Sequence, residues 1–130
     1  MAQEVVLLDT SVLIDYFRKT DKRRTFFVAL EERQVEFRIS AITVFEVYAG
    51  ATSSQLSFWD TLLNSVGVMP FGSAEARRAV TLQATLKEQR KQLAAPDLFI
   101  ASTALEAKLP IATLDRRHFG LVPGLVLHAP

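Results

Sequence analysis

The sequence predicts an α/β fold with a mainly parallel β-sheet and helices on both of its faces. Short apolar segments alternate along the chain with longer segments of helical spacing. Strands that alternate with helices in this way are typical of a parallel sheet covered on both sides. The first segment, VVLL at residues 5–8, is apolar throughout. Such an unbroken run suits a strand buried on both faces.

The composition indicates one globular domain, which we expect to span residues 1–130. Hydrophobic residues make up 49% and charged residues 22% of the chain, and its net charge of +1 neither implies nor forbids a polyanionic partner. There are no cysteines, which excludes disulfides, thiolate metal sites and a cysteine nucleophile. The chain has neither the basic start of a signal peptide nor an apolar run of the roughly 20 residues that a membrane span needs. We therefore expect a cytoplasmic protein that does not span a membrane.

The elements of the first half follow from local patterns. The acid and two hydroxyls at residues 9–11 end the first strand and favour the start of a helix. The further predicted elements are a helix at 12–18, a basic connection at 18–24, a helix at 25–34, a strand of alternating pattern at 35–40 and a helix at 41–50 that stops at Gly50.

The second half continues the alternation. The predicted elements are a helix at 54–64, a strand at 66–70, a helix from 73 to about 92 that Ser73 caps, a helix at 97–105, a strand at 109–113 and, after a turn, a last strand within 122–127. Pro96 is pre-set for the first turn of the helix at 97–105.

Two carboxylates are expected at one edge of this sheet. Asp9 and Asp115 follow strands, and ligands of open α/β sheets bind beyond the carboxyl ends of the strands. Each acid also has an ordinary structural explanation. Glu46 could point outward from its helix or be buried and paired, Asp97 could stabilise a helix N-terminus, and Asp115 could belong to a turn.

A cluster of these acids would be a site of oxygen ligands. Such ligands suit Mg²⁺ or Mn²⁺ better than Zn²⁺, and acidic Mg²⁺ sites most often serve phosphoryl chemistry. His118 and His128 lack metal-site spacing, which favours surface or turn roles for both. No glycine-rich phosphate loop or G-x-S-x-G elbow is present.

Five segments, in this order and at this spacing, resemble PIN-domain ribonucleases and, among them, the VapC-type toxins of bacterial toxin–antitoxin pairs. The segments are LLDTSVLID at 7–15, ITVFEVYAG at 42–50, DLFIASTA at 97–104, TLDRRHF at 113–119 and VPGL at 122–125. Each segment alone is weakly specific, whereas the five together span nearly the whole chain.

The resemblance implies a three-layer α/β/α sandwich and an endoribonuclease that depends on Mg²⁺, with Mn²⁺ as a possible substitute. It further implies that Asp9, Glu46 and Asp97 are the main acidic ligands and catalytic residues, and that Asp115 completes them. Thr10 and Thr113 match hydroxyls that support such a site. The dipeptide AP at 95–96 departs from the polar approach to Asp97 that the family leads us to expect.

The resemblance also implies partners: an RNA substrate, a cognate VapB-type antitoxin and a second copy of the chain in a homodimer. The apolar pairs at 26–27 and 58–59 suggest an interface, on which an antitoxin helix would lie with a basic side chain reaching toward the acids. The cations at 18–24, and Arg116 with Arg117, could contact RNA phosphates or simply be solvated.

Two other functions remain open. One is a catalytically inactive PIN-like module that binds RNA or protein, although the presence of all four acids argues against the loss of activity. The other is a different Mg²⁺ phosphohydrolase of α/β fold. A haloacid-dehalogenase-type site would need Asp-x-Asp after the first strand, where this chain has Asp9-Thr10-Ser11.

Overall fold

The centre of the molecule is a four-stranded sheet in which all strands are parallel. The computed structural model describes residues 3–128. The strands are β1 (Val5–Leu8), β2 (Glu36–Ser40), β3 (Gly67–Met69) and β4 (Ile111–Ala112), and their order in the sheet is β3-β2-β1-β4. The predicted α/β class with a parallel sheet is confirmed.

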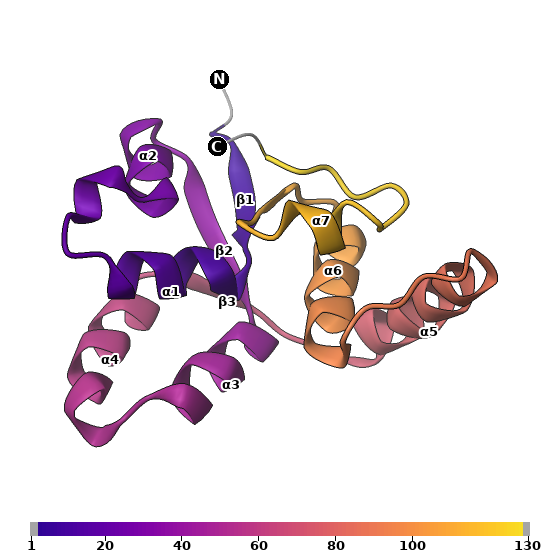
Figure 1. Cartoon of the computed structure of the whole chain (residues 1–130), viewed down its shortest axis with the longest axis horizontal. Helices are drawn as coiled ribbons and strands as arrows, with labels where there is room; N and C mark the ends of the chain where they lie inside the picture. The colour runs from indigo at the N-terminus through magenta and orange to yellow at the C-terminus, as the bar shows by residue number, and fades with distance from the viewer. Residues whose placement is uncertain (1–2, 129–130) are drawn as a thin grey trace.

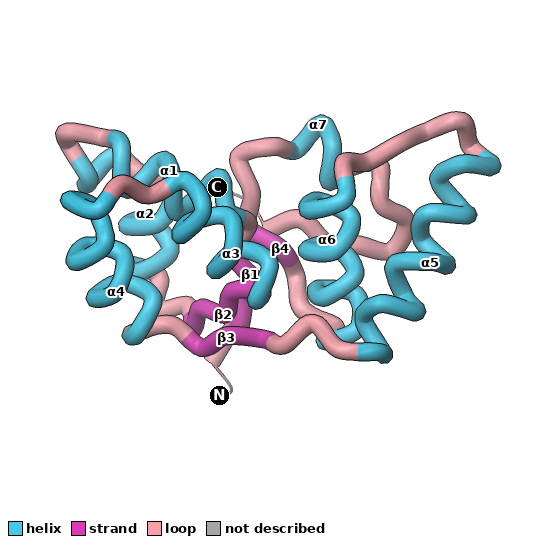
Figure 2. Tube along the Cα trace, turned by 90° about the horizontal axis from the view of Figure 1, so that it is seen from below, coloured by secondary structure: helices cyan, strands magenta, loops and turns pink. Residues whose placement is uncertain are grey.

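Helices cover the sheet on both sides and give three layers. Helices α1 (Thr10–Arg18), α2 (Phe26–Glu32), α3 (Ala41–Gly50) and α4 (Leu56–Asn64) lie on one side, together with the short 3₁₀ turns η1 (Lys22–Arg24) and η2 (Ser53–Gln55). Helices α5 (Ser73–Glu88), α6 (Ala95–Ala107) and α7 (Arg116–Phe119) lie on the other (Figures 1 and 2). Within residues 3–128, no helix has the length and apolar character that a membrane span requires.

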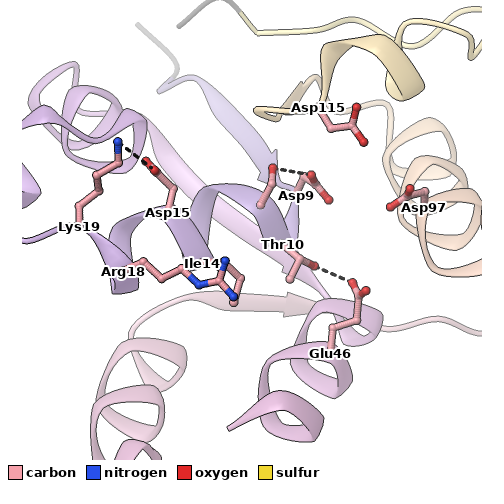
Figure 3. Close-up of a pocket in the computed structure, with 10 residues that line it drawn as sticks. Asp9, Thr10, Ile14, Asp15, Arg18, Lys19, Glu46, Asp97 and Asp115 are labelled. Atoms are coloured by element: carbon pink, nitrogen blue, oxygen red, sulfur yellow. Dashed lines mark hydrogen bonds and ion pairs between the residues drawn. The ribbon is translucent and has the colours of Figure 1, made fainter.

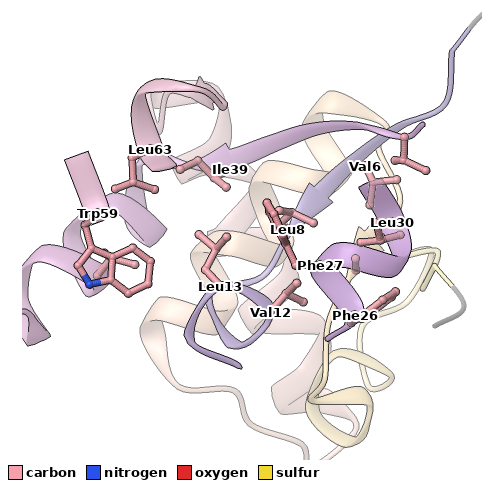
Figure 4. Packing of buried hydrophobic residues seen from close by; sticks show 13 residues of the cluster. Val6, Leu8, Val12, Leu13, Phe26, Phe27, Leu30, Ile39, Trp59 and Leu63 are labelled. Carbon is pink, nitrogen blue, oxygen red and sulfur yellow. The ribbon is translucent and has the colours of Figure 1, made fainter. Parts of the chain in front are cut away.

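Strand β1 separates two apolar cores because alternate side chains of a strand point to opposite faces. Val6 and Leu8 pack against the first group of helices, whereas Leu7 packs against α5 and α6. Figure 4 shows the first core, in which Phe26 and Phe27 belong to the same cluster as Val6 and Leu8 of β1.

The predicted interface at the apolar pairs is wrong, because the core uses these side chains. Phe26, Phe27 and Trp59 have exposed fractions of 6%, 4% and 2%, and the partly buried Phe58 packs against the same cluster. The number of aromatic residues in the sequence does not indicate which aromatic rings stay at the surface.

The sheet order creates a crevice at the carboxyl end of β1. The chain builds β2 and β3 on one side of β1 and then returns to place β4 on the other side. Ligand sites of open α/β sheets lie at such a reversal of strand order. The residues that directly follow β1 and β4 therefore meet here, among them Asp9 and Thr113.

The long helix α5 differs from the prediction in its cap and in its end. Helix α5 begins with Ser73, without a cap from its side chain, and ends at Glu88 rather than near residue 92. The end is a Schellman motif: Arg90 has a left-handed φ of 58°, and the Lys91 N–H donates to the Leu86 carbonyl over 2.8 Å. Glycine usually marks this position, so the sequence carried no signal for it.

The predicted last strand forms no more than a single bridge. Leu127 pairs with Ile111 in parallel, and the Ile111 N–H donates to the Val126 carbonyl over 2.9 Å. Pro123 lacks a backbone donor, and Gly124 adopts a φ of 78°, so the preceding backbone turns and cannot extend along β4.

Candidate functional site

Asp9 is held rigidly at the end of β1. It is the N-terminal flanking residue of α1 and has an exposed fraction of only 4%. The Ser11 and Thr113 hydroxyls both donate to its Oδ2, over 2.7 and 2.8 Å. Oδ1 makes no such hydrogen bond. Every fully buried side-chain oxygen within residues 3–128 has a hydrogen-bond partner, so Oδ1 must be accessible to solvent. One oxygen is thus fixed by the protein, and the other is available to a ligand.

Glu46 reaches the same crevice from helix α3. The Thr10 hydroxyl donates to Glu46 Oε1 over 2.8 Å and lies 2.9 Å from the hydroxyl of Thr43, one helical turn before Glu46. The contact joins the first turn of α1 to the middle of α3. The interpretation of Glu46 as an outward-facing helix residue therefore does not hold.

Asp97 enters from the opposite side, in the first turn of α6. Helix α6 begins at Ala95 with Pro96 in its first turn, so the unusual approach to Asp97 still places the acid at a helix start. Burial raises the pKa of Asp97 to about 6, and repulsion from Asp9, Asp115 and Glu46 adds to this effect. Asp97 makes no side-chain hydrogen bond or ion pair with residues 3–128. The nearby His118 offsets only part of the cost of its charge.

Asp115 occupies the turn after β4 and has a partner that the sequence did not suggest. Its Oδ1 accepts the His118 backbone N–H at the start of α7, and His118 Nδ1 lies 2.8 Å from its Oδ2. Thr113 Oγ1 accepts the Asp115 backbone N–H over 2.9 Å. Thr113 therefore connects Asp115 to Asp9, and His118 belongs to the site rather than to an unrelated turn.

All four acids line one pocket of about 560 Å³ (Figure 3). In this view Asp115 lies above Asp9, Asp97 lies to its right and Glu46 lies below it. The four carboxylates lie around the pocket rather than together at one point. Accordingly, no three His, Asp or Glu side chains within residues 3–128 are close enough together to hold one ion. The donor set still fits Mg²⁺ or Mn²⁺, because it is made of oxygen atoms and its mutual repulsion would be offset by a divalent cation.

Besides residues already predicted, the pocket is lined by Ser11, Ile14 and Asp15, which were not predicted, and by Lys19, which belongs to the predicted basic segment at 18–24. Ser11 follows Asp9 by two residues and binds its carboxylate, while Asp15 and Lys19 form an ion pair of 3.7 Å one and two turns further along α1. The DTS segment at 9–11 was a usable signal for Ser11, because a hydroxyl at i+2 can reach back to an acid. No comparable local signal marked Ile14 or Asp15.

The basic segment at 18–24 is largely explained by local structure. The Lys22 ammonium donates to the Tyr16 and Phe17 carbonyls at the end of α1, and Arg23 and Arg24 pair with Asp21. Arg18 differs, because its side chain has no hydrogen bond or ion pair with residues 3–128 and it lines the acidic pocket.

The raised pKa of Asp97 predicts a specific pH dependence of stability. Its folded-state pKa of about 6 lies above the ordinary value of 3.8, so the folded protein binds this proton more tightly than the unfolded chain does. This contribution to stability is complete below about pH 4 and is lost as the pH rises to about 6. In metal-free buffer, the melting temperature of wild type should therefore fall across this window relative to Asp97→Asn.

The matched control is Glu88→Gln, which removes a charge from an exposed position at the end of α5. Its melting temperature should follow wild type across the same pH range. Parallel curves for wild type and Asp97→Asn would show that Asp97 carries an ordinary pKa.

Comparisons with known proteins agree with this geometry. The PIN domain family model matches residues 6–124. "Ribonuclease VapC10" of Mycobacterium tuberculosis is 29% identical over 116 residues, which cover 88% of this chain and 86% of the relative.

Two solved structures show the same fold. A chain of a toxin–antitoxin complex from Klebsiella pneumoniae is 30% identical, with a TM-score of 0.75 over 93% of this chain and 95% of its own. A chain of VapBC2 from Rickettsia felis, bound to a DNA fragment from its promoter, has a TM-score of 0.85 at 21% identity, over 95% and 97% of the two chains.

Proposed function

This chain belongs to the PIN domain family, and from that premise we propose that it is a metal-dependent endoribonuclease that acts as the toxin of a type II toxin–antitoxin pair. The observation that carries the proposal is the gathering of Asp9, Glu46, Asp97 and Asp115 around one pocket at the reversal of strand order. Relatives named as ribonucleases and a similar chain within a toxin–antitoxin complex support it.

In this proposal the carboxylates hold Mg²⁺, for which Mn²⁺ could substitute. Asp9 would offer its free Oδ1, while Ser11 and Thr113 keep Oδ2 in place. The Thr10 hydroxyl would fix one oxygen of Glu46 in the same way. The bound cation would supply a nucleophilic water near neutral pH and offset charge on the phosphate oxygens. Asp97 would complete the set above about pH 6, where it is ionised, and Asp115 would join it.

Arg116 and Arg117 are the proposed contacts to the RNA backbone. Both lie in α7, directly after Asp115 in the chain, and both are exposed. Arg116 reaches the His128 carbonyl over 3.3 Å, whereas Arg117 has no side-chain partner within residues 3–128. Phosphate contacts position a substrate without specifying its sequence, so these residues would set affinity. The preference for RNA rests on the family, since hydrolysis by an activated water needs no 2′-hydroxyl.

The proposed partners are a VapB-type antitoxin and a second copy of the chain, in the cytoplasm. The surface retains exposed apolar side chains on both helical layers, among them Phe45 on α3 and Val80 on α5, with exposed fractions of 69% and 68%. Such side chains favour interfaces over free solvent. A basic antitoxin side chain that enters the acidic pocket would compete with the cation for Asp9, Glu46 and Asp97.

The test is cleavage of a mixture of structured and unstructured RNAs by the purified protein. Cleavage is expected with Mg²⁺ or Mn²⁺, and it should stop with EDTA and recover when metal is added back. Co-purification with the product of an adjacent small gene should suppress the same cleavage. Metal-bound protein that leaves every RNA intact would instead favour the inactive binding module.

A further inference from the structure

A second, smaller pocket adjoins the acidic one. Its volume is about 180 Å³, and it lies between α1, the end of α3 and the start of α4. It shares Ile14, Arg18 and Glu46 with the acidic pocket, so a ligand that fills one lies directly beside the other. The proposed RNA cleavage does not use the space inside this second pocket.

One wall of this second pocket is aromatic and fixed. The rings of Phe17 and Trp59 stack with centroids 5.0 Å apart and planes at 29°, and Phe58 meets Trp59 edge-on at 5.2 Å. Trp59 is almost wholly buried, so its position is set by the core. The wall is therefore preformed, and a flat ring would lie against the partly exposed Phe17, behind which Trp59 is buried.

Two other residues that line this pocket carry hydrogen-bond donors. The exposed Arg18 guanidinium has no partner within residues 3–128, in contrast to its neighbour Lys19, which pairs with Asp15. The Gln55 side chain accepts the Thr52 backbone N–H through Oε1 over 3.0 Å, which leaves its amide nitrogen as a donor. A ligand with acceptor atoms on its edge suits this pair.

We propose that the second pocket binds one nucleobase of the RNA substrate, next to the phosphate at the acidic pocket, and that Arg18 contacts the RNA where the two pockets meet. The proposal rests on the proposed ribonuclease function. A volume of about 180 Å³ is below the roughly 300–1,000 Å³ of pockets for drug-sized ligands, and so suits a single base. Unpaired RNA bases are bound in this manner, between an aromatic or guanidinium surface and edge-directed donors.

Charge also favours RNA as the occupant. The acidic pocket repels a phosphate unless cations stand nearby, and Arg18 is the cation that both pockets share. A base in the second pocket would place its own phosphate beside Arg18 and near the carboxylates. The pocket would then choose which nucleotide flanks the cleaved bond.

Gly50 provides a way to fill the pocket without disturbing the fold. It lines the second pocket at the end of α3, and a Cβ built on it meets no other atom within 4 Å. Gly50→Leu should therefore occupy the space that the base needs. The matched control is Ala49→Leu, one residue earlier on the same helix, exposed and outside both pockets.

The measurement uses Trp59, which is the single tryptophan of the chain and lies in the pocket wall. Short RNA oligomers, and the same oligomers with one abasic position, are titrated in EDTA while tryptophan emission and anisotropy are followed. Intact RNA should change the emission, and the abasic oligomer should not. Gly50→Leu should weaken binding by about 5- to 150-fold, the range for loss of one stacked base, whereas Ala49→Leu should match wild type.

Cleavage with Mg²⁺ separates this proposal from the ribonuclease function. Gly50→Leu should raise KM and lose preference at one flanking nucleotide while it still cuts. The base pocket is overturned if Gly50→Leu binds and cuts RNA as wild type does, or if abasic oligomers alter the emission equally. It is also overturned if Gly50→Leu still binds RNA but no longer binds a co-expressed protein partner, because the pocket would then be the binding site of that partner. Absence of cleavage by wild type would refute the ribonuclease function itself.

Discussion

Asp97→Asn is expected to lower the rate of RNA cleavage by about 10²-fold or more, comparable to the loss of one charge-stabilising group in other active sites. Asn keeps the size of the side chain and one oxygen but removes the charge that a divalent cation needs. The fold should persist, because Asp97 makes no hydrogen bond or ion pair within residues 3–128 and is repelled by three other acids. Rates are measured on one defined RNA under single-turnover conditions.

The control for this prediction is again Glu88→Gln, which should cut at the wild-type rate. Added Mg²⁺ should raise the melting temperature of wild type and of the control by more than that of Asp97→Asn, since stabilisation by a ligand follows its affinity. Cleavage at the wild-type rate by Asp97→Asn would remove this residue from the catalytic set.

Thr113→Val should destabilise the protein by about 1–3 kcal/mol, because it leaves polar groups without partners in a buried place. Thr113 has an exposed fraction of 1%, donates to Asp9 Oδ2 and accepts the Asp115 backbone N–H. Valine has nearly the same shape but can do neither. Chemical denaturation measures the loss of stability, and a slower cleavage rate should accompany it, because Asp9 loses one of the two hydroxyls that orient it.

Thr103→Val is the matched control, since Thr103 is equally buried on α6. Its hydroxyl donates only to the Phe99 carbonyl, one turn back on the same helix, which remains bonded within the helix when the hydroxyl is lost. The cost should therefore be much smaller than at Thr113. Equal losses for the two variants would mean that the Thr113 contacts contribute little to stability.

The strands and most helices could be predicted because their signals are local. The apolar run at 5–8 and the alternating pattern at 35–40 correspond to β1 and β2, and the helix predicted at 41–50 is α3 without a shift at either end. The errors came where a boundary depends on backbone geometry, as at Arg90, or where a strand needs a neighbour, as near Leu127.

The site was predictable to the level of residue identity but not of contacts. The five segments placed Asp9, Glu46, Asp97 and Asp115 in one family pattern, and the structure brings all four to one pocket. The hydroxyl network through Ser11, the pairing of His118 with Asp115 and the isolation of Arg18 were not predicted. The Ser11 contact had a usable local signal, whereas the other two features depend on side-chain rotamers and packing, which sequence spacing does not specify.

The sequence by itself determined the parallel α/β architecture, because periodicity and strand-end chemistry act over a few residues, and its resemblance to a family pointed to the four acids. Tertiary structure alone decided what those acids experience. Asp9 and Thr113 are 104 residues apart, yet their contact fixes one ligand, and only the packing of α6 near three other carboxylates raises the pKa of Asp97. Electrostatic repulsion and desolvation depend on distance and burial, and the order of strands in the sheet sets both. The aromatic wall of the second pocket likewise exists only because α1 packs on α4.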